Sequence, residues 1–228
     1  MPFIVLEGLD GAGKSTQINK LRRLIESRGH VCRYIHFPRF DAPVYGELIA
    51  RFLRGELGAV DQVDPYLVAL LYAGDRADAA ETIRGWLAQG DWVIADRYVY
   101  SNIGYQCAKV ADPERRKALA DWILAVEFGT WNIPQPDITL FLDVPFAFTE
   151  RKLAQHRTGE DRSYLQGADD IHESSLDLQR RVREVYTAAA ENGELHAVDC
   201  SDGAGGMESP ETIFGRITKV LARIPGLD

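Results

Sequence analysis

Long apolar segments are missing from this chain. Before its first acidic and glycine residues, the N-terminus offers only the apolar run Phe3 to Leu6, which is too short for a signal peptide. No later segment reaches the length of a membrane-spanning helix. We therefore expect a cytoplasmic protein that does not bind a membrane.

Cysteine is scarce as well. Cys32, Cys107 and Cys200 are widely spaced, form no C-x-x-C pair and leave an odd thiol. Such a set suits a reducing compartment better than a framework of disulfide bonds. We expect all three side chains to be buried or idle thiols.

Positive charge is in deficit across the chain. There are 26 lysines and arginines against 34 aspartates and glutamates, which gives a formal net charge of -8. A general electrostatic surface for nucleic acid or for an anionic membrane is therefore not expected. Any cations that bind phosphate must be gathered in one place.

Short apolar runs rich in β-branched residues alternate with longer helical patterns. The strand candidates are Phe3 to Leu6, Val31 to His36, Trp92 to Ala95, Ile138 to Leu142 and Leu195 to Val198. The helix candidates are Ser15 to Arg28, Pro65 to Ala88, Pro113 to Phe128, Pro145 to Gln155, Ile171 to Glu191 and a closing helix after Pro210. The alternation predicts an α/β fold with a parallel sheet, and we expect a single domain over 1–228.

Two polar segments interrupt this alternation. The stretch SDGAGGMESP, 201–210, predicts a surface loop. The stretch QHRTGEDRSYLQGADD separates two helix candidates, and polar excursions of this kind form lids. We expect a lid over about 155–171.

One short stretch, GLDGAGKSTQ, specifies chemistry. Gly8, Gly13, Lys14 and Ser15 satisfy the spacing G-x-x-x-x-G-K-[ST] between a strand candidate and a helix candidate. Glycines let backbone N–H groups surround phosphate oxygens, Lys14 adds a point charge, and the Ser15 hydroxyl can ligate Mg²⁺. The residues expected to bind the triphosphate are Gly8, Gly11, Ala12, Gly13, Lys14, Ser15 and Thr16.

Several enzyme classes share that loop. A GTPase would carry an N-K-x-D motif and a D-x-x-G loop after a strand, but Asn19 and Lys20 are followed by Leu21 and Arg22. A large ATPase motor would need a longer chain. A small nucleoside or nucleotide kinase remains, and its acceptor site must come from segments beyond the loop.

Two segments could wall an acceptor pocket. In FPRF, Arg39 could neutralise an acceptor phosphate between Phe37 and Phe40, or it could be a solvated arginine on a strand-exit turn. In LLYAGDRAD, Tyr72 and Arg76 share one helix face. They could stack on a base and hydrogen-bond its edge, or be a core tyrosine and a surface arginine.

A third segment, VIADRYVYSNIGYQ, places Asp96 and Arg97 at the end of another strand candidate. Arg97 could bridge phosphates there, while Asp96 orients it or organises Mg²⁺ through water; a structural ion pair is the alternative. Ser101, Asn102 and Tyr105 follow at a helix start, with polar groups that can reach a sugar or a base.

The lid candidate carries Arg157 and Arg162. Phosphoryl transfer depends on positioning and on charge stabilisation. Cations that arrive when a lid closes would neutralise developing charge while water is excluded. Two solvated arginines on an exposed loop are the alternative.

These motifs together resemble thymidylate kinases, P-loop enzymes that phosphorylate dTMP to dTDP with ATP. The matching stretches are FIVLEGLDGAGKSTQ, FPRF, VDPYLVALLYAGDR, DRYVYSNIGYQ, PQPDITLFLDVP and the lid through DIHE. They span nearly the whole chain in the order of the family. The resemblance implies a five-stranded parallel core, a homodimer, and ATP with Mg²⁺ as the phosphoryl donor.

The resemblance also implies roles by position. Tyr72 falls where an aromatic ring stacks on thymine, Arg76 matches a base-contacting arginine, and Arg97 matches the arginine at the acceptor phosphate. The expected acceptor site is Asp10, Phe37, Arg39, Tyr72, Arg76, Asp96, Arg97, Ser101, Asn102 and Tyr105. The expected catalytic residues are Asp10, Lys14, Arg97, Arg157 and Arg162, and the expected metal-binding residues are Ser15 and Asp96.

One branch of the family has a P-loop arginine where this chain has Gly11. The basic side chain is absent here, as in the branch whose lid supplies the catalytic arginines, and RTGEDR resembles that lid. Two departures remain. Phe40 stands where tyrosine is common, and the lid runs on through SYLQGADDIHE.

The predicted reaction is in-line transfer of the γ-phosphoryl group of ATP to the 5′-phosphate of dTMP, without a covalent intermediate. A deoxynucleoside kinase is one alternative; it would use a base near a 5′-hydroxyl, and Glu7 is a candidate. A nucleotide-binding regulatory module without turnover is the other. Arginines directed at an acceptor phosphate argue against the first, and intact Lys14, Ser15 and Arg97 argue against the second.

Overall fold

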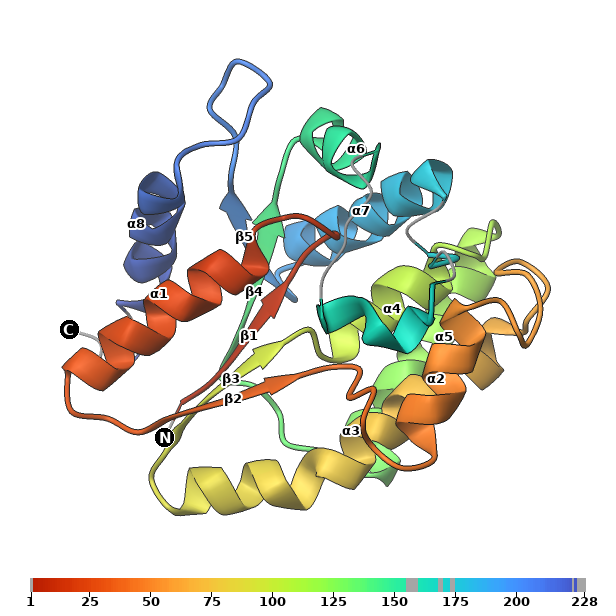
Figure 1. Ribbon diagram of the computed structural model, residues 1–228, viewed down its shortest axis with the longest axis horizontal. Coiled ribbons are helices and arrows are strands. Elements are labelled where there is room, and N and C mark those ends of the chain that lie inside the picture. Colours follow the sequence, from red (N-terminus) through yellow and green to blue (C-terminus); the bar gives the residue numbers. More distant parts are fainter. Residues whose placement is uncertain (1, 155–159, 168–169, 173–174, 223, 225–228) are drawn as a thin grey trace.

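The core of the protein is one parallel sheet with strand order β2-β3-β1-β4-β5 (Figure 1). The computed structural model describes residues 2–154, 160–167, 170–172, 175–222 and 224. The strands are β1 (Phe3–Glu7), β2 (Cys32–His36), β3 (Trp92–Asp96), β4 (Ile138–Asp143) and β5 (His196–Asp199). The predicted α/β fold is confirmed, and each strand begins and ends within one residue of its predicted bounds.

Helices fill the connections between the strands. They are α1 (Lys14–Ser27), α2 (Tyr45–Leu53), α3 (Pro65–Ala88), α4 (Val99–Cys107), α5 (Pro113–Leu124), α6 (Phe146–Ala154), α7 (Leu176–Glu191) and α8 (Pro210–Leu221). A π-helical turn, η1 (Ala125–Thr130), follows α5, and a 3₁₀ helix, η2 (Glu160–Leu165), follows α6.

Both faces of the sheet are covered, which explains why β1 is apolar without alternation. Ile4 and Leu6 face α1 and α8. Phe3 and Val5 face α3, α4 and α5 on the other side. Successive side chains of a strand point to opposite faces, so one strand contributes to both layers of the core. Figure 1 shows α1 and α8 on one side of the sheet and α3, α4 and α5 on the other.

Three helices start with the same N-cap arrangement. Asp64, Asp112 and Ser209 precede the prolines that open α3, α5 and α8, and each side chain accepts a hydrogen bond from a backbone N–H of the first turn. Proline fits the first helical position because its missing N–H would have no partner there. These starts lie where the sequence predicts them.

Three differences from the predicted helices have local causes. Helix α2 has no predicted counterpart; it is short, and it is held by burial of Ile49 and Phe52. Helix α7 begins at Leu176 instead of Ile171, because the Ser175 side chain caps it by accepting from the Leu178 N–H. Helix α5 ends at Leu124, where η1 begins.

The cysteines are free thiols. Cys107 and Cys200 are buried and Cys32 is partly buried. Burial raises the pKa of the Cys107 and Cys200 thiols to about 12, so both are protonated and unreactive at neutral pH. Among the described residues, no helix combines the length and apolar character needed to span a membrane.

Candidate active site

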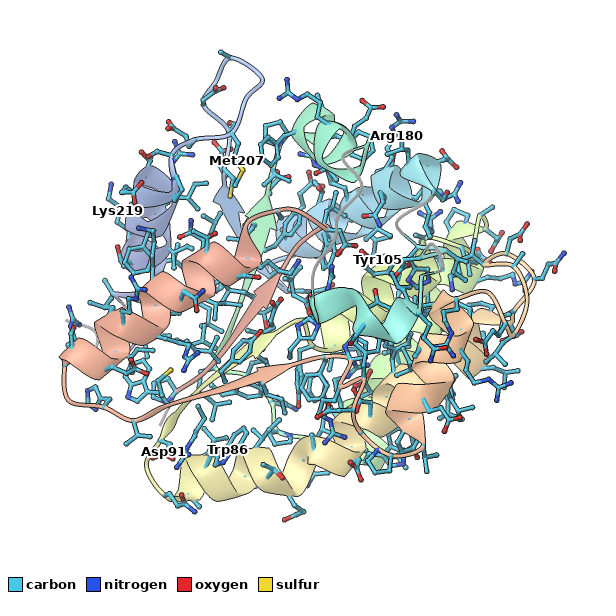
Figure 2. The ribbon with its side chains drawn as sticks, in the orientation of Figure 1. Trp86, Asp91, Tyr105, Arg180, Met207 and Lys219 are labelled. Atoms are coloured by element: carbon cyan, nitrogen blue, oxygen red, sulfur yellow. The ribbon has the colours of Figure 1, made fainter. Side chains whose placement is uncertain are left out.

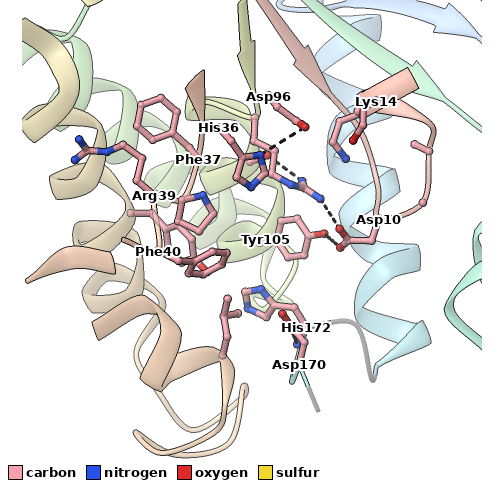
Figure 3. Close-up of a pocket in the computed structure, with 18 of the residues that line it drawn as sticks. Asp10, Lys14, His36, Phe37, Arg39, Phe40, Asp96, Tyr105, Asp170 and His172 are labelled. Carbon is pink, nitrogen blue, oxygen red and sulfur yellow. Dashed lines mark hydrogen bonds and ion pairs between the residues drawn. The ribbon is translucent and has the colours of Figure 1, made fainter. Parts of the chain in front are cut away.

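A cleft of about 1380 Å³ opens at the carboxyl edge of the sheet (Figure 3). This is the edge at which open α/β sheets bind ligands. The lining comes from the phosphate-binding loop, the FPRF turn, α3, the β3–α4 junction and the segment after η2. Most residues that the sequence proposes for a site therefore lie around one space.

The loop between β1 and α1 has the backbone that phosphate binding requires. Gly8, Gly11 and Gly13 have φ of 148°, 77° and 83°, conformations that side chains with a Cβ rarely adopt. A Cβ on Gly8 would also lie 3.2 Å from the carbonyl oxygen of Leu142. Only glycine fits these turns without strain, and turns of this kind can direct backbone N–H groups at a bound anion.

Lys14 begins α1 and lines the cleft. Its ammonium group donates to the carbonyl oxygens of Gly8 and Leu9 at 3.1 and 3.0 Å. Burial and the charge of Arg97 lower the pKa of Lys14 to about 8, against the opposing effect of nearby carboxylates. Ser15 and Thr16 follow on the same helix turn and also line the cleft.

Arg97 lies opposite Lys14, directly after β3. One terminal nitrogen donates to Asp10 Oδ1 at 2.8 Å, and the other donates to Ser101 Oγ at 3.1 Å. Tyr105 donates from its hydroxyl to the second oxygen of Asp10 at 2.8 Å. Although burial alone would lower it, Tyr105 and Asp10 hold the pKa of Arg97 well above its ordinary value. The Arg97 guanidinium is therefore a fixed cation that contacts Asp10 of the loop.

Asp96 has a different partner from the one its position next to Arg97 suggests. Its Oδ2 lies 3.5 Å from His36 Nδ1, whereas Asp10 is the carboxylate that orients Arg97. Burial would raise the pKa of Asp96, but His36 and Lys14 hold it below its usual value. Its buried Oδ1 has no hydrogen-bond partner among the described residues.

The far end of the cleft carries a buried charge pair. Arg76 donates from Nε and Nη2 to both carboxylate oxygens of Glu127, at 2.5 and 2.7 Å. Asn102 donates from its amide to Glu127 at 3.0 Å and to the Ala69 carbonyl at 3.0 Å, while its buried Oδ1 has no partner within the described chain. Tyr72 of α3 lines the same end.

Glu127 is a site residue that the sequence reasoning missed. It lies in η1, fully buried, and it fixes Arg76 and Asn102 in place. A carboxylate inside the apolar stretch WILAVEFGTW was the signal available, because a buried acidic residue nearly always has a cationic partner. Short π-helical turns such as η1 are frequent at functional sites.

The FPRF turn contributes differently at each position. Phe37 is buried against Tyr98, with ring centroids 5.6 Å apart. Arg39 donates to Asp75 and Asp78, and in Figure 3 its guanidinium points away from Asp10 and Lys14. Its predicted contact with an acceptor phosphate stays a prediction.

The lid candidate contacts this turn. Phe40 and Tyr164 of η2 stack with ring centroids 3.6 Å apart and planes 7° from parallel. Arg54, just after α2, donates to the Tyr164 carbonyl at 2.6 Å, and the Ile171 N–H donates to the Leu53 carbonyl at 3.0 Å. These contacts place η2 at the cleft.

The two lid arginines are not located. Arg157 lies outside the described residues, and only the backbone of Arg162, in η2, is described. Asp170, at the end of the predicted lid, is buried and accepts a hydrogen bond from the Tyr164 hydroxyl at 2.8 Å.

Further lining residues escaped the sequence reasoning. His172 and Gln106 line the cleft near Tyr105. Met207 and Pro210 line it from the predicted 201–210 loop, and the Met207 side chain lies next to Gly13 (Figure 2). Nothing in local composition marks these residues, because only the fold brings them to the cleft.

Glu7 is not among the residues that line the cleft. It is fully buried and accepts hydrogen bonds from the Tyr98 and Ser101 N–H groups, the Ser101 hydroxyl and the Tyr186 hydroxyl. Its carboxylate therefore holds the start of α4 against β1 and α7. Its hydrogen bonds do not suit a base at an acceptor hydroxyl.

Comparisons of the sequence with known proteins all point to one enzyme family. The family model described as thymidylate kinase matches residues 6–207. A thymidylate kinase of Mycobacterium tuberculosis H37Rv is 35% identical over 194 residues, which cover 84% of this chain and 86% of the relative. A probable thymidylate kinase of Thermococcus kodakarensis is 33% identical over 230 residues, 98% of each chain.

A solved structure supports the fold. The thymidylate kinase of Candida albicans has a TM-score of 0.72 to this chain at 24% sequence identity. The superposition covers 100% of this chain and 93% of the other. The two proteins therefore share one fold.

Proposed function

The chain belongs to the thymidylate kinase family and phosphorylates dTMP to dTDP with ATP; from this premise, we propose that the cleft at the carboxyl edge of the sheet holds both nucleotides. The loop from Gly8 to Thr16 takes the phosphates of ATP. The acceptor lies between Arg97 and the base end formed by α3, α4 and Glu127. The two nucleotides meet where Lys14 and Arg97 face each other.

The donor end carries the features that phosphoryl transfer needs. Backbone N–H groups of the loop and the start of α1 attract the β- and γ-phosphates, and Lys14 adds a buried cation. Met207 and Pro210 border the same end and offer apolar surface for the donor base.

Mg²⁺ fits this donor set. The ion prefers oxygen ligands and keeps several waters, so it needs few protein groups. It would be held by phosphate oxygens, by the Ser15 hydroxyl and by water at Asp96 Oδ1, which is buried without a hydrogen-bond partner among the described residues. When bound, Mg²⁺ would neutralise charge on the transferring phosphoryl group.

The base end suits thymine. Thymine presents an N–H donor at N3 and a carbonyl acceptor at O4. The buried Asn102 Oδ1 can accept from the first, and Arg76, whose Nε and Nη2 donate to Glu127, can donate from Nη1 to the second. Glu127 supports both contacts because it fixes the two side chains that make them. Tyr72 supplies an aromatic face beside them.

The transfer itself requires no covalent enzyme intermediate. An acceptor phosphate oxygen is already a nucleophile, so the protein supplies alignment and positive charge. Arg97 binds the acceptor phosphate, and Asp10 orients Arg97 through a hydrogen bond. Lys14 stabilises the negative charge on the phosphoryl group during transfer. We further propose that Arg157 and Arg162 of the lid complete this charge as in the lid-arginine branch of the family.

Two properties of the whole protein belong to the same proposal. Tyr66, Leu67 and Leu70 of α3 expose 37, 61 and 40% of their surface, an apolar patch of the kind that forms protein interfaces. We propose that it is the surface of a homodimer. We also propose that the protein is a single cytoplasmic domain that acts on nucleotides and does not bind nucleic acid or membranes, in keeping with its net charge of -8.

The observation that carries the acceptor assignment is the buried Arg97 cation, fixed by Asp10 opposite Lys14. The test is ADP formation from ATP and Mg²⁺ against dTMP, dUMP, thymidine, AMP, CMP, GMP and no acceptor, with products separated by chromatography. We expect dTDP from dTMP and little reaction with thymidine or water. Preferred turnover of thymidine would instead identify a nucleoside kinase, and turnover independent of acceptor would identify an ATPase.

A further inference from the structure

Tyr186 is a buried tyrosine of α7 whose hydroxyl group is not needed for packing. The residue is 1% exposed, and its ring stacks on Phe141 of β4, with centroids 4.9 Å apart and planes 13° from parallel. A phenylalanine would make the same stack. A buried hydroxyl group destabilises a fold unless it is hydrogen-bonded, so its partners must explain why the chain has tyrosine here.

The hydroxyl groups of Tyr186 and Ser101 converge on one carboxylate oxygen. Both donate to Glu7 Oε2, at 2.9 and 2.5 Å, and the two hydroxyl oxygens lie 3.0 Å apart. Arg97 donates from Nη1 to Ser101 Oγ at 3.1 Å, and a guanidinium group has no acceptor atom, so the direction of this contact is fixed. The proton of Ser101 therefore points to Glu7, and a lone pair of its oxygen points to Arg97.

Glu7 also holds the backbone that follows Arg97. Its Oε1 accepts from the N–H of Tyr98 at 2.8 Å and from the N–H of Ser101 at 3.0 Å. Tyr98 comes directly after Arg97, whose backbone is left-handed, so this backbone is anchored at the next residue. The Tyr98 and Ser101 donors belong to the segment between β3 and α4, whereas Tyr186 connects the same carboxylate to α7.

The packing of α4 against α7 lets Tyr186 reach this position. A Cβ on Gly104 of α4 would lie 3.3 Å from two atoms of the Tyr186 ring, so a larger residue would require the ring to shift. Burial and the charge of Glu7 raise the pKa of Tyr186 well above its ordinary value, against the opposing effect of Arg97. The hydroxyl therefore keeps its proton and acts as a donor.

We propose that Tyr186 is a positioning residue that orients the Arg97 guanidinium toward the acceptor phosphate. It acts through Glu7 and Ser101, because it is not among the residues that line the cleft. Asp10 holds one terminal nitrogen of Arg97 and Ser101 holds the other, so loss of either support frees the guanidinium to turn. The inference rests on the proposed function, because it takes Arg97 as the cation at the acceptor phosphate.

The test is a double-mutant cycle between Tyr186→Phe and Arg97→Ala. Tyr186→Phe keeps the ring that stacks on Phe141 and removes the hydroxyl group. With Arg97 present, we expect kcat/KM for dTMP to fall about tenfold, because the cation is misaligned, while the dissociation constant for ATP changes less than about threefold. In the Arg97→Ala background, Tyr186→Phe should change kcat/KM by less than about twofold.

This loss of additivity separates positioning from packing. A hydroxyl group that only stabilises the fold would lower the thermal unfolding midpoint, and it would lower kcat/KM by the same factor with and without Arg97. Thermal unfolding of all four proteins of the cycle measures the structural part. The proposal is wrong if Tyr186→Phe keeps kcat/KM for dTMP within about twofold of the wild type, or if its loss is equal in both backgrounds.

Gly104→Ala is a second variant, and it keeps every hydroxyl group. Its new Cβ requires the Tyr186 ring to shift, and alanine favours the helix, so this variant answers the question if Tyr186→Phe does not fold. Its loss of kcat/KM for dTMP should also disappear in the Arg97→Ala background. An equal loss in that background would count against the proposal.

Tyr98→Phe is the matched control. Tyr98 is also 1% exposed and does not line the cleft, and its hydroxyl donates to the Pro134 carbonyl at 2.9 Å. The variant keeps the backbone N–H that donates to Glu7, and it should keep kcat/KM for dTMP within about twofold. A loss as large as that of Tyr186→Phe would overturn the assignment. A wild type inactive with dTMP, or an Arg97→Ala variant as active as the wild type, would instead contradict the proposed function.

Discussion

Arg97 combines a strained backbone with a fixed side chain. Its φ of 67° lies in the left-handed region, where residues other than glycine are uncommon. Such strain persists at functional sites because surrounding contacts determine it, and here Asp10 and Ser101 hold the guanidinium. The conformation aims a planar cation into the cleft.

Arg97→Ala should therefore impair use of the acceptor far more than binding of the donor. We expect kcat/KM for dTMP to fall about 10³-fold, because an aimed charge at the reacting phosphate is lost. The dissociation constant for ATP should change less than about threefold. Steady-state kinetics with varied dTMP and equilibrium titration with ATP measure the two quantities.

A second variant and one contrary outcome complete this test. Arg97→Lys keeps the charge without the planar fork, and it should recover part of the loss. If Arg97→Ala weakens ATP and dTMP equally, Arg97 serves the donor as well and the acceptor assignment is wrong.

The buried Lys109 makes the free energy of unfolding depend on pH. Its ammonium group lies 4.8 Å from the centre of the Phe52 ring and donates to Gln106 at 2.8 Å, and burial lowers its pKa to about 7. The unfolded chain keeps a lysine pKa near 10.4. Between these values the unfolded state binds the extra proton, so the free energy of unfolding rises with pH in this window.

Lys109→Met should remove that rise. The variant should be more stable than the wild type below pH 7, and its advantage should shrink by up to about 1.4 kcal/mol per pH unit above pH 7. Urea denaturation at pH 6, 7.5 and 9 measures the effect. Lys117→Met, at a lysine exposed on α5, is the control, and the same trend there would contradict the assignment to Lys109.

At the scale of elements, α2 and α3 cross closely beside the acceptor end of the cleft. A Cβ on Gly74 would overlap the ring of Tyr45, and a Cβ on Gly46 would overlap the carbonyl oxygens of Arg39 and Phe40. Both glycines are helical, so they are needed for close approach and not for a left-handed backbone. This contact fixes α3, which carries Tyr72 and Arg76, against the FPRF turn.

Gly74→Ala should lower the free energy of unfolding by about 1–3 kcal/mol, because the Tyr45 ring must move. It should also raise KM for dTMP, since Tyr72 and Arg76 flank the position. Gly85→Ala on the same helix is the matched control: nothing lies within 4 Å of its Cβ, and it should stabilise by about 0.5–1 kcal/mol. Thermal and urea unfolding separate the two variants, and equal effects would refute the crossing.

The features that the sequence predicts correctly are those set by residues close together in the chain. The strands and the phosphate-binding loop follow from short patterns of apolar and glycine residues, and they lie where predicted. Helix α2 depends on burial against α3 and escaped prediction. Glu127 lies behind the cleft wall in a segment without a motif, so only tertiary packing reveals its pairing with Arg76.

The roles of predicted site residues show the same limit. The sequence placed Arg39, Arg76 and Arg97 near one another, and all three line the cleft. Their partners could not be read from spacing. Arg76 is paired with Glu127, 51 positions away, and Arg97 with Asp10, 87 positions away.

At the scale of the whole molecule, the apolar patch on α3 predicts assembly. Leu67→Glu with Leu70→Glu should weaken the proposed homodimer by at least about tenfold in dissociation constant, because buried charges would replace apolar contacts. Light scattering after size-exclusion chromatography measures the mass. Leu57→Glu, at an exposed leucine outside the patch, is the control and should leave the mass unchanged. A mass unaffected by the double change would place any interface elsewhere.

The stacking of Phe40 on Tyr164 has an optical consequence. The tryptophans of the chain are Trp86, Trp92, Trp122 and Trp131, and none of them lines the cleft. Their emission should therefore form a steady background during nucleotide binding. In Tyr164→Trp the indole would stack on Phe40 at the contact between the FPRF turn and η2, and its emission would change if that contact opened or closed. Fluorescence of this variant during nucleotide binding would therefore test whether the predicted lid moves.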